Sequence, residues 1–350
     1  MNVRMNVNRS LTQNAPQNRP TEPTLAPRPR IAVVIPCYNE AVTIGTVVAN
    51  FKRALPTAEV YVYDNNSSDD TVVIATAAGA IVRSEPLQGK GNVVRRMFAD
   101  VEADAYVLVD GDGTYDAASA TRMVDLLLRD SLDMVNGARV ATTDAAYRPG
   151  HAFGNRLLTA TVGAIFGKRV RDMLSGYRVL SRRFVKSFPA LASGFETETE
   201  LTVHALELRL PIVEIDTPYR DRPAGSQSKL RTFRDGLRIL KTIVLLVKEE
   251  RPLRFFSSVG AALAATSLIL AWPLLTDYLA TGLVPRFPTA ILATGLMILA
   301  FMSAVAGLIL DTVTLGRREL KRLHYLALQG PGLVDRRRHT PTDSLTSAGE

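Results

Sequence analysis

The chain has 350 residues, which allow one large domain or two modest ones with an ample apolar core. Its single cysteine, Cys37, excludes an internal disulfide and fits a reducing compartment. The net charge of +8 lies mainly at the ends: residues 1–30 hold five Arg against one Glu, and residues 317–350 hold seven Lys or Arg against four acids. A nearly neutral middle argues against nucleic acid as a partner, because a nucleic-acid-binding core carries its own basic excess.

The first 30 residues are rich in Asn, Pro and Arg and lack the apolar core of a secretory signal. We expect residues 1–30 to form a disordered, unprocessed leader. From residue 31, short apolar runs alternate with helix-length segments, which predicts a mostly parallel, three-layer α/β sheet. The expected strands cover residues 31–35, 60–63, 80–82, 106–109, 134–135 and 211–215.

Loops that carry polar residues follow the first four expected strands, and they hold the candidate site residues. These residues are Pro36, Tyr38 and Glu40 after the first, Asp64 after the second, Lys90 after the third, and Asp110 and Asp112 after the fourth. The carboxyl ends of parallel strands meet at one edge of a sheet, so these loops are expected to line one cleft.

Asp110 and Asp112 end a buried run and are two residues apart, so both carboxylates can point to the same side. Such hard oxygen ligands suit Mg²⁺ or Mn²⁺ shared with substrate phosphates. A plain turn is the alternative, because Asp-Gly pairs form turns. Lys90 stands between two glycines that would let it approach a phosphate, but without the full Walker spacing this segment alone favours a Gly-rich turn.

Four motifs together resemble the nucleotide-sugar half of family 2 glycosyltransferases, which have the GT-A fold. They are residues 34–40, 64–71, 89–91 and 110–112, in this order and spacing. The resemblance implies that Pro36, Tyr38, Glu40 and Asp64 bind the base and ribose of the donor. It also implies that Lys90 belongs to the donor site and that Asp110 and Asp112 bind the metal and the diphosphate.

Residues 136–139, 154–156, 171–178 and 222–229 are similar to polyprenyl-phosphate glycosyltransferases such as dolichyl-phosphate mannose synthase. The similarity implies that Arg139 and Arg156, with Ser175, hold the lipid phosphate, and that Arg222 and Lys229 close over the donor diphosphate. Guanidinium forks match phosphate oxygens, which agrees with this assignment. The resemblance covers residues 31–250, and the residues after Asp112 depart from those of mannose synthases, which leaves the sugar and the base open.

Acidic residues begin an expected helix that runs from about residue 196 to residue 208. Glu198 or Glu196 stands where other family members place a catalytic carboxylate. The alternative is a favourable placement of acids at a helix N-terminus. His204 on the same helix is expected to be a packed or surface histidine.

The C-terminal third changes character. A basic amphipathic pattern over residues 231–252 predicts an interfacial helix, with a surface helix packed on the catalytic domain as the alternative. Uncharged stretches of 22 and 24 residues then lie between Arg254 and Asp277 and between Arg286 and Asp311. Each is long enough to cross a membrane, which predicts two transmembrane helices at about 255–276 and 288–310 within residues 253–316.

Positive residues flank this pair on both outer sides, whereas the connecting loop holds only Arg286. The positive-inside rule therefore places the catalytic domain, both termini and the basic tail of residues 317–350 in the cytoplasm, with the hairpin in the cell (inner) membrane. Two helices are few for enclosing a long lipid, which suggests that copies of the chain form a homo-oligomer.

These patterns predict an enzyme that transfers a hexose, with inversion, from a nucleoside-diphosphate sugar to a polyprenyl phosphate. Asp112 with Asp110 would hold the metal, and Asp172 is the first candidate for an assisting base, with Glu198 the second. Transfer to a lipid hydroxyl is an alternative that needs a true base, and a catalytically inactive membrane scaffold is another. A processive synthase is disfavoured, because the only tryptophan, Trp272, does not stand in a Gln-x-x-Arg-Trp motif.

Overall fold

The computed structural model describes residues 28–141, 159–167, 170–192, 194, 196–223, 241 and 244–331. Several predictions lie outside these residues. They concern the leader up to residue 27, Arg156, Lys229, most of the amphipathic segment 231–252 and the tail from residue 332.

Seven strands form one mixed sheet in the order β3-β2-β1-β4-β6-β5-β7. Their bounds are β1 Ile31–Cys37, β2 Glu59–Asp64, β3 Ile81–Ser84, β4 Ala105–Leu108, β5 Met134–Ala141, β6 Arg178–Ser181 and β7 Ile212–Tyr219. All pairings between neighbours are parallel except those that β6 makes with β4 and β5. The prediction of a mostly parallel α/β sheet is confirmed.

Strand β6 is the strand of this sheet that the sequence patterns did not predict. It runs antiparallel, and its first residue, Arg178, pairs with Leu108, the last residue of β4. The segment that leads into β6 therefore lies at the carboxyl end of β4, the same edge at which the polar loops of the parallel strands meet.

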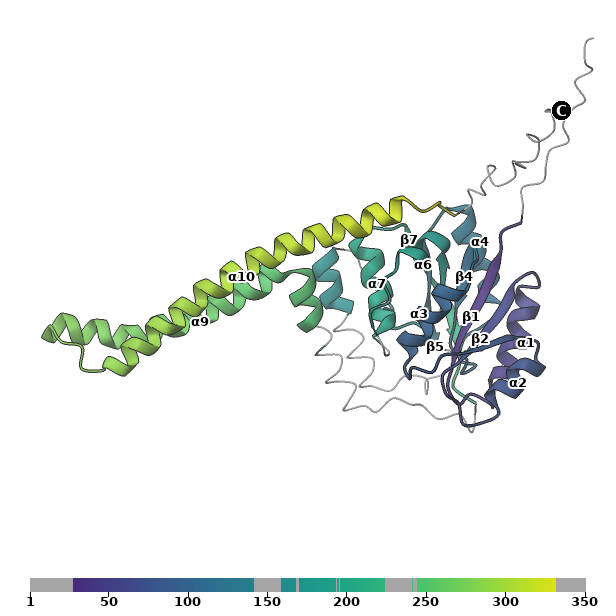
Figure 1. Cartoon of the computed structure of the whole chain (residues 1–350), viewed down its shortest axis with the longest axis horizontal. Coiled ribbons are helices and arrows are strands. Elements are labelled where there is room, and N and C mark those ends of the chain that lie inside the picture. The colour runs from purple at the N-terminus through teal and green to yellow at the C-terminus, as the bar shows by residue number, and fades with distance from the viewer. Residues whose placement is uncertain are drawn as a thin grey trace, which may run out of the picture.

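Helices cover both faces of the sheet and give three layers (Figure 1). Val48 and Phe51 of α1 and Met123 of α4 join the apolar core on one face. Met97 of α3 and Leu201 of α7 join the core on the other. The helix bounds are α1 Ile44–Ala54, α2 Thr71–Ala77, α3 Lys90–Asp100, α4 Ser119–Arg129, α6 Arg182–Ser187, α7 Thr197–Glu207, α9 Pro252–Thr281 and α10 Phe287–Leu326.

Helices α9 and α10 form a long antiparallel hairpin that projects from the α/β domain (Figure 1). Small residues repeat every seven positions where the two helices meet. Gly260 and Ser267 of α9 face Ala300 and Ala293 of α10: a Cβ at Gly260 would lie 2.8 Å from the carbonyl oxygen of Ala300, and Ser267 Oγ donates to the carbonyl of Ala293 at 2.7 Å. This spacing lets the two backbones approach closely.

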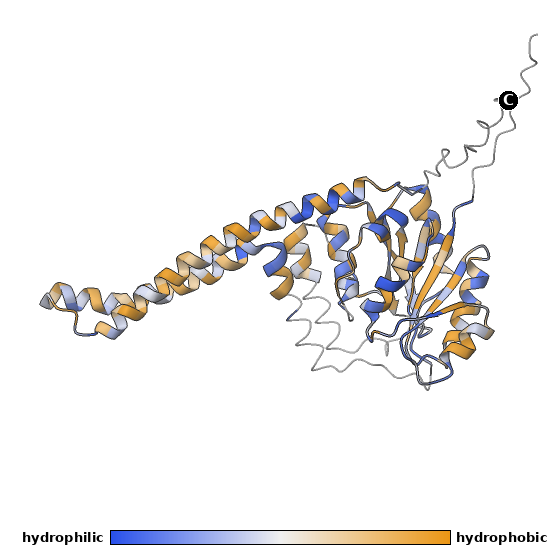
Figure 2. Ribbon diagram, viewed as in Figure 1, coloured by the Kyte–Doolittle hydropathy of each residue, from blue (hydrophilic) through white to orange (hydrophobic). Residues whose placement is uncertain are grey.

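Both helices are long and apolar enough to cross a membrane. Only 11% and 17% of their most apolar windows are buried inside the protein, whereas a core helix of a soluble domain would be mostly buried. Figure 2 shows apolar residues along most of the hairpin and polar residues where α10 lies beside the α/β domain. The hairpin therefore indicates association with a membrane.

His204 on α7 is buried, and this burial makes a pH dependence predictable. Its ring packs edge-on against Phe184 and Phe188, and its Nε2 lies 3.2 Å from Ser187 Oγ. Burial, with a smaller effect of Lys321, lowers the pKa of His204 to about 3.

Between pH 6.5 and pH 3 the unfolded chain therefore binds a proton at His204 that the folded chain does not bind. Folding stability falls as the pH drops through this window, and we expect a loss of about 2 kcal/mol from this residue between pH 7 and pH 5. Denaturant unfolding of the wild type and of His204→Leu at both pH values measures it. An equal loss in both proteins would contradict the assignment.

Candidate active site

The loops that follow β1, β2 and β3 are joined to one another by side-chain hydrogen bonds. Asn39, in the left-handed region with φ of 53°, accepts from the main-chain N–H of Ser68 at 2.8 Å. Asp69 accepts from the main-chain N–H of Ala41 at 3.1 Å. Asn65 donates to the carbonyls of Glu85 and Leu87 and accepts from the main-chain N–H of Gly89 at 2.7 Å. The three loops therefore form one continuous rim.

The residues predicted to bind the donor base and ribose lie on this rim. Pro36 stands near the end of β1, and Tyr38 exposes 39% of its surface just beyond it. Glu40 and Asp64 are both buried, and Asp64 accepts from the main-chain N–H of Ser67. The structure thus brings all four residues to the carboxyl ends of β1 and β2.

Lys90, at the start of α3, links two carboxylates from distant parts of the chain. Its ammonium contacts Oδ1 of Asp110, which follows β4, and Oε1 of Glu198 on α7. Burial lowers the pKa of Lys90, but the carboxylates of Asp110 and Glu198 raise it by a larger amount. The pKa of Lys90 therefore lies above its usual value. Lys90 is therefore a fixed positive charge, and Glu198 Oε2 is buried with no hydrogen-bond partner among the described residues.

Asp112, two residues after Asp110 in the same loop, is buried. Its Oδ1 accepts from the main-chain N–H and the hydroxyl of Thr114, at 3.1 and 2.6 Å. Its Oδ2 lies 2.7 Å from Nη2 of Arg222, which follows β7. Two of the predicted donor-site residues, Asp112 and Arg222, are thus in direct contact.

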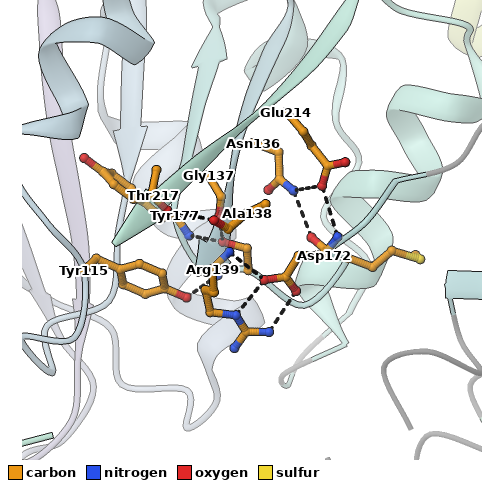
Figure 3. A network of polar contacts seen from close by, with 12 residues as sticks. Tyr115, Asn136, Gly137, Ala138, Arg139, Asp172, Tyr177, Glu214 and Thr217 are labelled. Carbon is orange, nitrogen blue, oxygen red and sulfur yellow. Dashed lines mark hydrogen bonds and ion pairs between the residues drawn. The ribbon is translucent and has the colours of Figure 1, made fainter. Parts of the chain in front are cut away.

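Arg139 and Asp172 form a bidentate ion pair at the end of β5 (Figure 3). Nε and Nη2 of Arg139 donate to the two oxygens of Asp172, at 2.7 and 2.8 Å. Burial opposes the charge of Arg139, yet Tyr115 and Asp172 raise its pKa well above the usual value. Both Asp172 oxygens therefore orient a guanidinium, a geometry that favours a positioning role over that of a free base.

Tyr219 connects this ion pair to the carboxylates of the donor site. The guanidinium of Arg139 lies 5.5 Å from the centre of its ring. Burial first, and then the neighbouring Asp112 carboxylate, raise the pKa of Tyr219. Tyr219 also pairs with Tyr115, three residues after Asp112, so Arg139 lies beside the Asp112 loop.

Glu214 on β7 holds the loop that carries Asp172. Its carboxylate accepts from the main-chain N–H of Asp172 at 3.1 Å and from the amide of Asn136 at 2.9 Å (Figure 3). It also accepts from the main-chain N–H of Arg171 at 2.7 Å. Sequence reasoning did not single out Glu214. The available signal was a carboxylate between the apolar residues Val213 and Ile215, since a partly buried charge needs partners.

Ser175 and Arg178 both have structural contacts in the same loop. The buried Ser175 hydroxyl donates to the carbonyl of Gly137 at 2.6 Å and accepts from the main-chain N–H of Tyr177. The prediction that Ser175 binds the acceptor phosphate gains no support from this geometry. Arg178 is fully buried and donates to main-chain carbonyls of this loop and of Glu198, which fixes the loop against α7.

The structure therefore brings most predicted site residues to one edge of the sheet. Lys90, Asp110 and Glu198 form one cluster, Asp112 and Arg222 a second, and Arg139 and Asp172 a third. The positions of Arg156 and Lys229 lie outside the described residues.

The tight contact between Gly176 and Asp110 gives a further prediction. A Cβ added at Gly176 would lie 2.3 Å from Oδ2 of Asp110, so Gly176→Ala must displace this carboxylate. We expect the sugar transfer predicted from the sequence motifs to fall roughly 10- to 100-fold, while the melting temperature changes little because the carboxylate is partly exposed and can rotate outward. Unchanged transfer would show that the position of Asp110 is unimportant.

The sequence and fold match known proteins over the same region. Residues 32–188 match the family model described as Glycosyl transferase family 2. The Glycosyltransferase AglJ of Haloferax volcanii is 33% identical over 305 residues, which are 85% of this chain and 98% of that protein. This chain belongs to glycosyltransferase family 2.

Two further relatives of this glycosyltransferase bear on its chemistry. The Dolichyl-phosphate hexose transferase of Haloferax volcanii is 28% identical over 63% of this chain and 95% of that protein. Glucosyl-3-phosphoglycerate synthase from Mycobacterium tuberculosis, solved with Mn²⁺, UDP and glucosyl-3-phosphoglycerate, superposes with a TM-score of 0.51 at 26% identity. That match covers 63% of this chain and 79% of that one. The family and these neighbours identify the protein as a transferase of the GT-A fold that uses a nucleotide-sugar donor.

Proposed function

We propose that this glycosyltransferase transfers a hexose from a nucleoside-diphosphate sugar to a polyprenyl phosphate, with inversion, at the cytoplasmic face of the cell membrane. The observation that carries the proposal is the Arg139–Asp172 pair, a guanidinium held in a fixed orientation beside the Asp112 loop. Such a fork matches the oxygens of a phosphate monoester. The apolar hairpin and the similarity to a dolichyl-phosphate hexose transferase support a lipid as the carrier of that phosphate.

The residues at the Asp110 and Asp112 loop fit a divalent metal that shares its ligands with a substrate. Among the described residues, no three or more His, Cys, Asp and Glu side chains are grouped to hold a metal ion. A pair of carboxylates completed by diphosphate oxygens is the usual way in which Mg²⁺ binds, and Mn²⁺ prefers similar ligands. Asp110 and Asp112 would hold the ion, which would stabilise the negative charge of the departing diphosphate.

The transfer itself forms a bond between an acceptor phosphate oxygen and the anomeric carbon, and breaks the bond from that carbon to the diphosphate. Arg139 orients the acceptor oxygen for attack opposite the leaving group. A phosphate monoester is already largely ionised near neutral pH, because its second pKa is about 6, so no strong base is required. Lys90 and Arg222 add positive charge around the donor diphosphate.

A lipid hydroxyl is the second candidate acceptor, and Glu198 is the observation that favours it. This carboxylate is buried and leaves Oε2 without a partner among the described residues. A hydroxyl acceptor needs a base to remove its proton, and Glu198 would be that base.

Membranes that contain the protein distinguish the two acceptors. Radiolabelled UDP- and GDP-hexoses are supplied with and without added polyprenyl phosphate and Mn²⁺, and organic-extractable label is measured. A product that requires both additions and is released by mild acid is the expected result and names the donor. A product resistant to mild acid would support the hydroxyl acceptor, and no lipid product from any donor would contradict both and favour a scaffold.

A further inference from the structure

Helix α10 is about twice as long as a membrane requires. Its 40 residues span about 60 Å, against roughly 30 Å for the hydrocarbon core. The last part of the helix, here called the α10 extension (residues 316–326), lies beside the catalytic domain (Figure 1). Membrane crossing alone does not account for it.

The C-terminal end of the α10 extension contacts Asp133, a fully buried carboxylate just before β5. Tyr325 donates its hydroxyl to Oδ2 of Asp133 at 2.7 Å, and Arg183 forms a bidentate pair with the same carboxylate at 2.6 and 2.9 Å. The Arg183 guanidinium also lies 4.9 Å from the centre of the Tyr325 ring. The end of the helix is therefore fixed by a buried polar cluster.

A second buried carboxylate, Glu207 at the end of α7, contacts the preceding turns of the extension. Lys321 Nζ lies 2.7 Å and Arg318 Nε 3.6 Å from its oxygens, and the Glu207 side chain has no exposed surface. Nη2 of Arg318 also forms an ion pair with Oε2 of Glu250, near the start of α9, at 2.8 Å. Separating these groups would leave buried charges unpaired, which is strongly unfavourable. These contacts of the α10 extension with Asp133 and Glu207, here called the junction, therefore hold the catalytic domain firmly against α10.

Strand β5 joins this junction to the acceptor site. Asp133 precedes its first residue and Arg139 lies near its other end, about 20 Å away along the strand. A continuous rigid path thus runs from the apolar hairpin through the α10 extension, Asp133 and β5 to Arg139.

We propose that the junction of Tyr325 and Lys321 with Asp133 and Glu207 positions Arg139 at the depth of a membrane-borne acceptor phosphate. These are positioning residues, because none of them lies at the edge of the sheet that carries the site. The inference rests on the proposed lipid acceptor. A flexible tether would keep the domain near the membrane but would not fix the height and tilt of the site.

Gly316 offers a matched pair of substitutions between the apolar part of α10 and the junction. No atom lies within 4 Å of a Cβ added there, so Gly316→Ala fits and keeps the helix straight. Gly316→Pro removes a helical hydrogen bond and kinks the helix while every junction residue is retained. The double variant Lys321→Ala/Tyr325→Ala removes the junction contacts themselves. Its control is the double variant Arg322→Ala/Leu326→Ala, which changes exposed positions in the same turns of the helix.

The experiment compares two acceptors in proteoliposomes: polyprenyl phosphate in the bilayer and a short, water-soluble prenyl phosphate. For Gly316→Pro and Lys321→Ala/Tyr325→Ala we expect transfer to the bilayer acceptor to fall on the order of 10-fold or more, with transfer to the soluble acceptor nearly unchanged. Both controls should behave as the wild type.

Equal loss with both acceptors would reduce the junction to a purely structural role, and no loss with either would show that a flexible tether suffices. Each of these results overturns the inference while leaving the proposed reaction intact. A wild type that is inactive with both acceptors would instead refute the proposed reaction, and the inference with it.

Discussion

Asp112→Asn is expected to lower sugar transfer roughly 10²- to 10³-fold, the size of effect seen when a group that stabilises developing charge is removed. Asparagine has nearly the same shape, and its carbonyl oxygen still accepts from Thr114. The substitution removes the negative charge that would bind the metal and that contacts Arg222 at 2.7 Å. Initial rates with saturating donor and acceptor, over a range of Mn²⁺ concentrations, measure the effect.

Asp116 supplies the control for this substitution, because it is a carboxylate four residues further along the same loop. It accepts from the main-chain N–H and the hydroxyl of Ser119 at the start of α4, at 3.0 and 2.9 Å. Asp116→Asn should therefore cost at most about 1 kcal/mol of stability and leave the rate of transfer almost unchanged. Equal rates of transfer for Asp112→Asn and the wild type would contradict the proposed mechanism.

The parallel half of the sheet and the cleft at its edge were predictable from the sequence because apolar strands followed by polar loops leave a clear pattern. Strand β6 was not, since it contains only two apolar residues between Arg178 and Ser181. Arg178 has the charge of a surface residue but is fully buried, and three of its hydrogen bonds go to main-chain carbonyls that a sequence does not display.

Which site residues contact one another likewise could not be predicted from the sequence. Lys90 and Glu198 are 108 positions apart, and their contact depends on how α7 packs against α3. The motif that contains Asp172 predicted a site residue, but only the structure shows that both of its oxygens are bonded to Arg139. Spacing along the chain predicts which loops meet, whereas the partner of each charge is decided by tertiary packing.

The two roles considered for Asp172 give different kinetics. If Asp172 positions Arg139, Asp172→Asn should raise the KM for the polyprenyl phosphate about 10- to 100-fold, which corresponds to about 1.5–3 kcal/mol for a lost hydrogen bond to a charged group. The amide nitrogen of asparagine would face the guanidinium donors and could not accept from them. The rate at saturating acceptor should fall much less, and its pH profile should keep its shape.

A base role predicts the opposite pattern, with a lower kcat, a changed pH profile and an almost unchanged KM. Arg139→Lys tests the distinction further, because it keeps the charge but loses the fork that Asp172 orients. If Asp172 acts through Arg139, the double variant should be hardly worse than Arg139→Lys alone, since contacting residues that act as a unit are not additive. Additive losses would mean that Asp172 has a function of its own at the reacting phosphate.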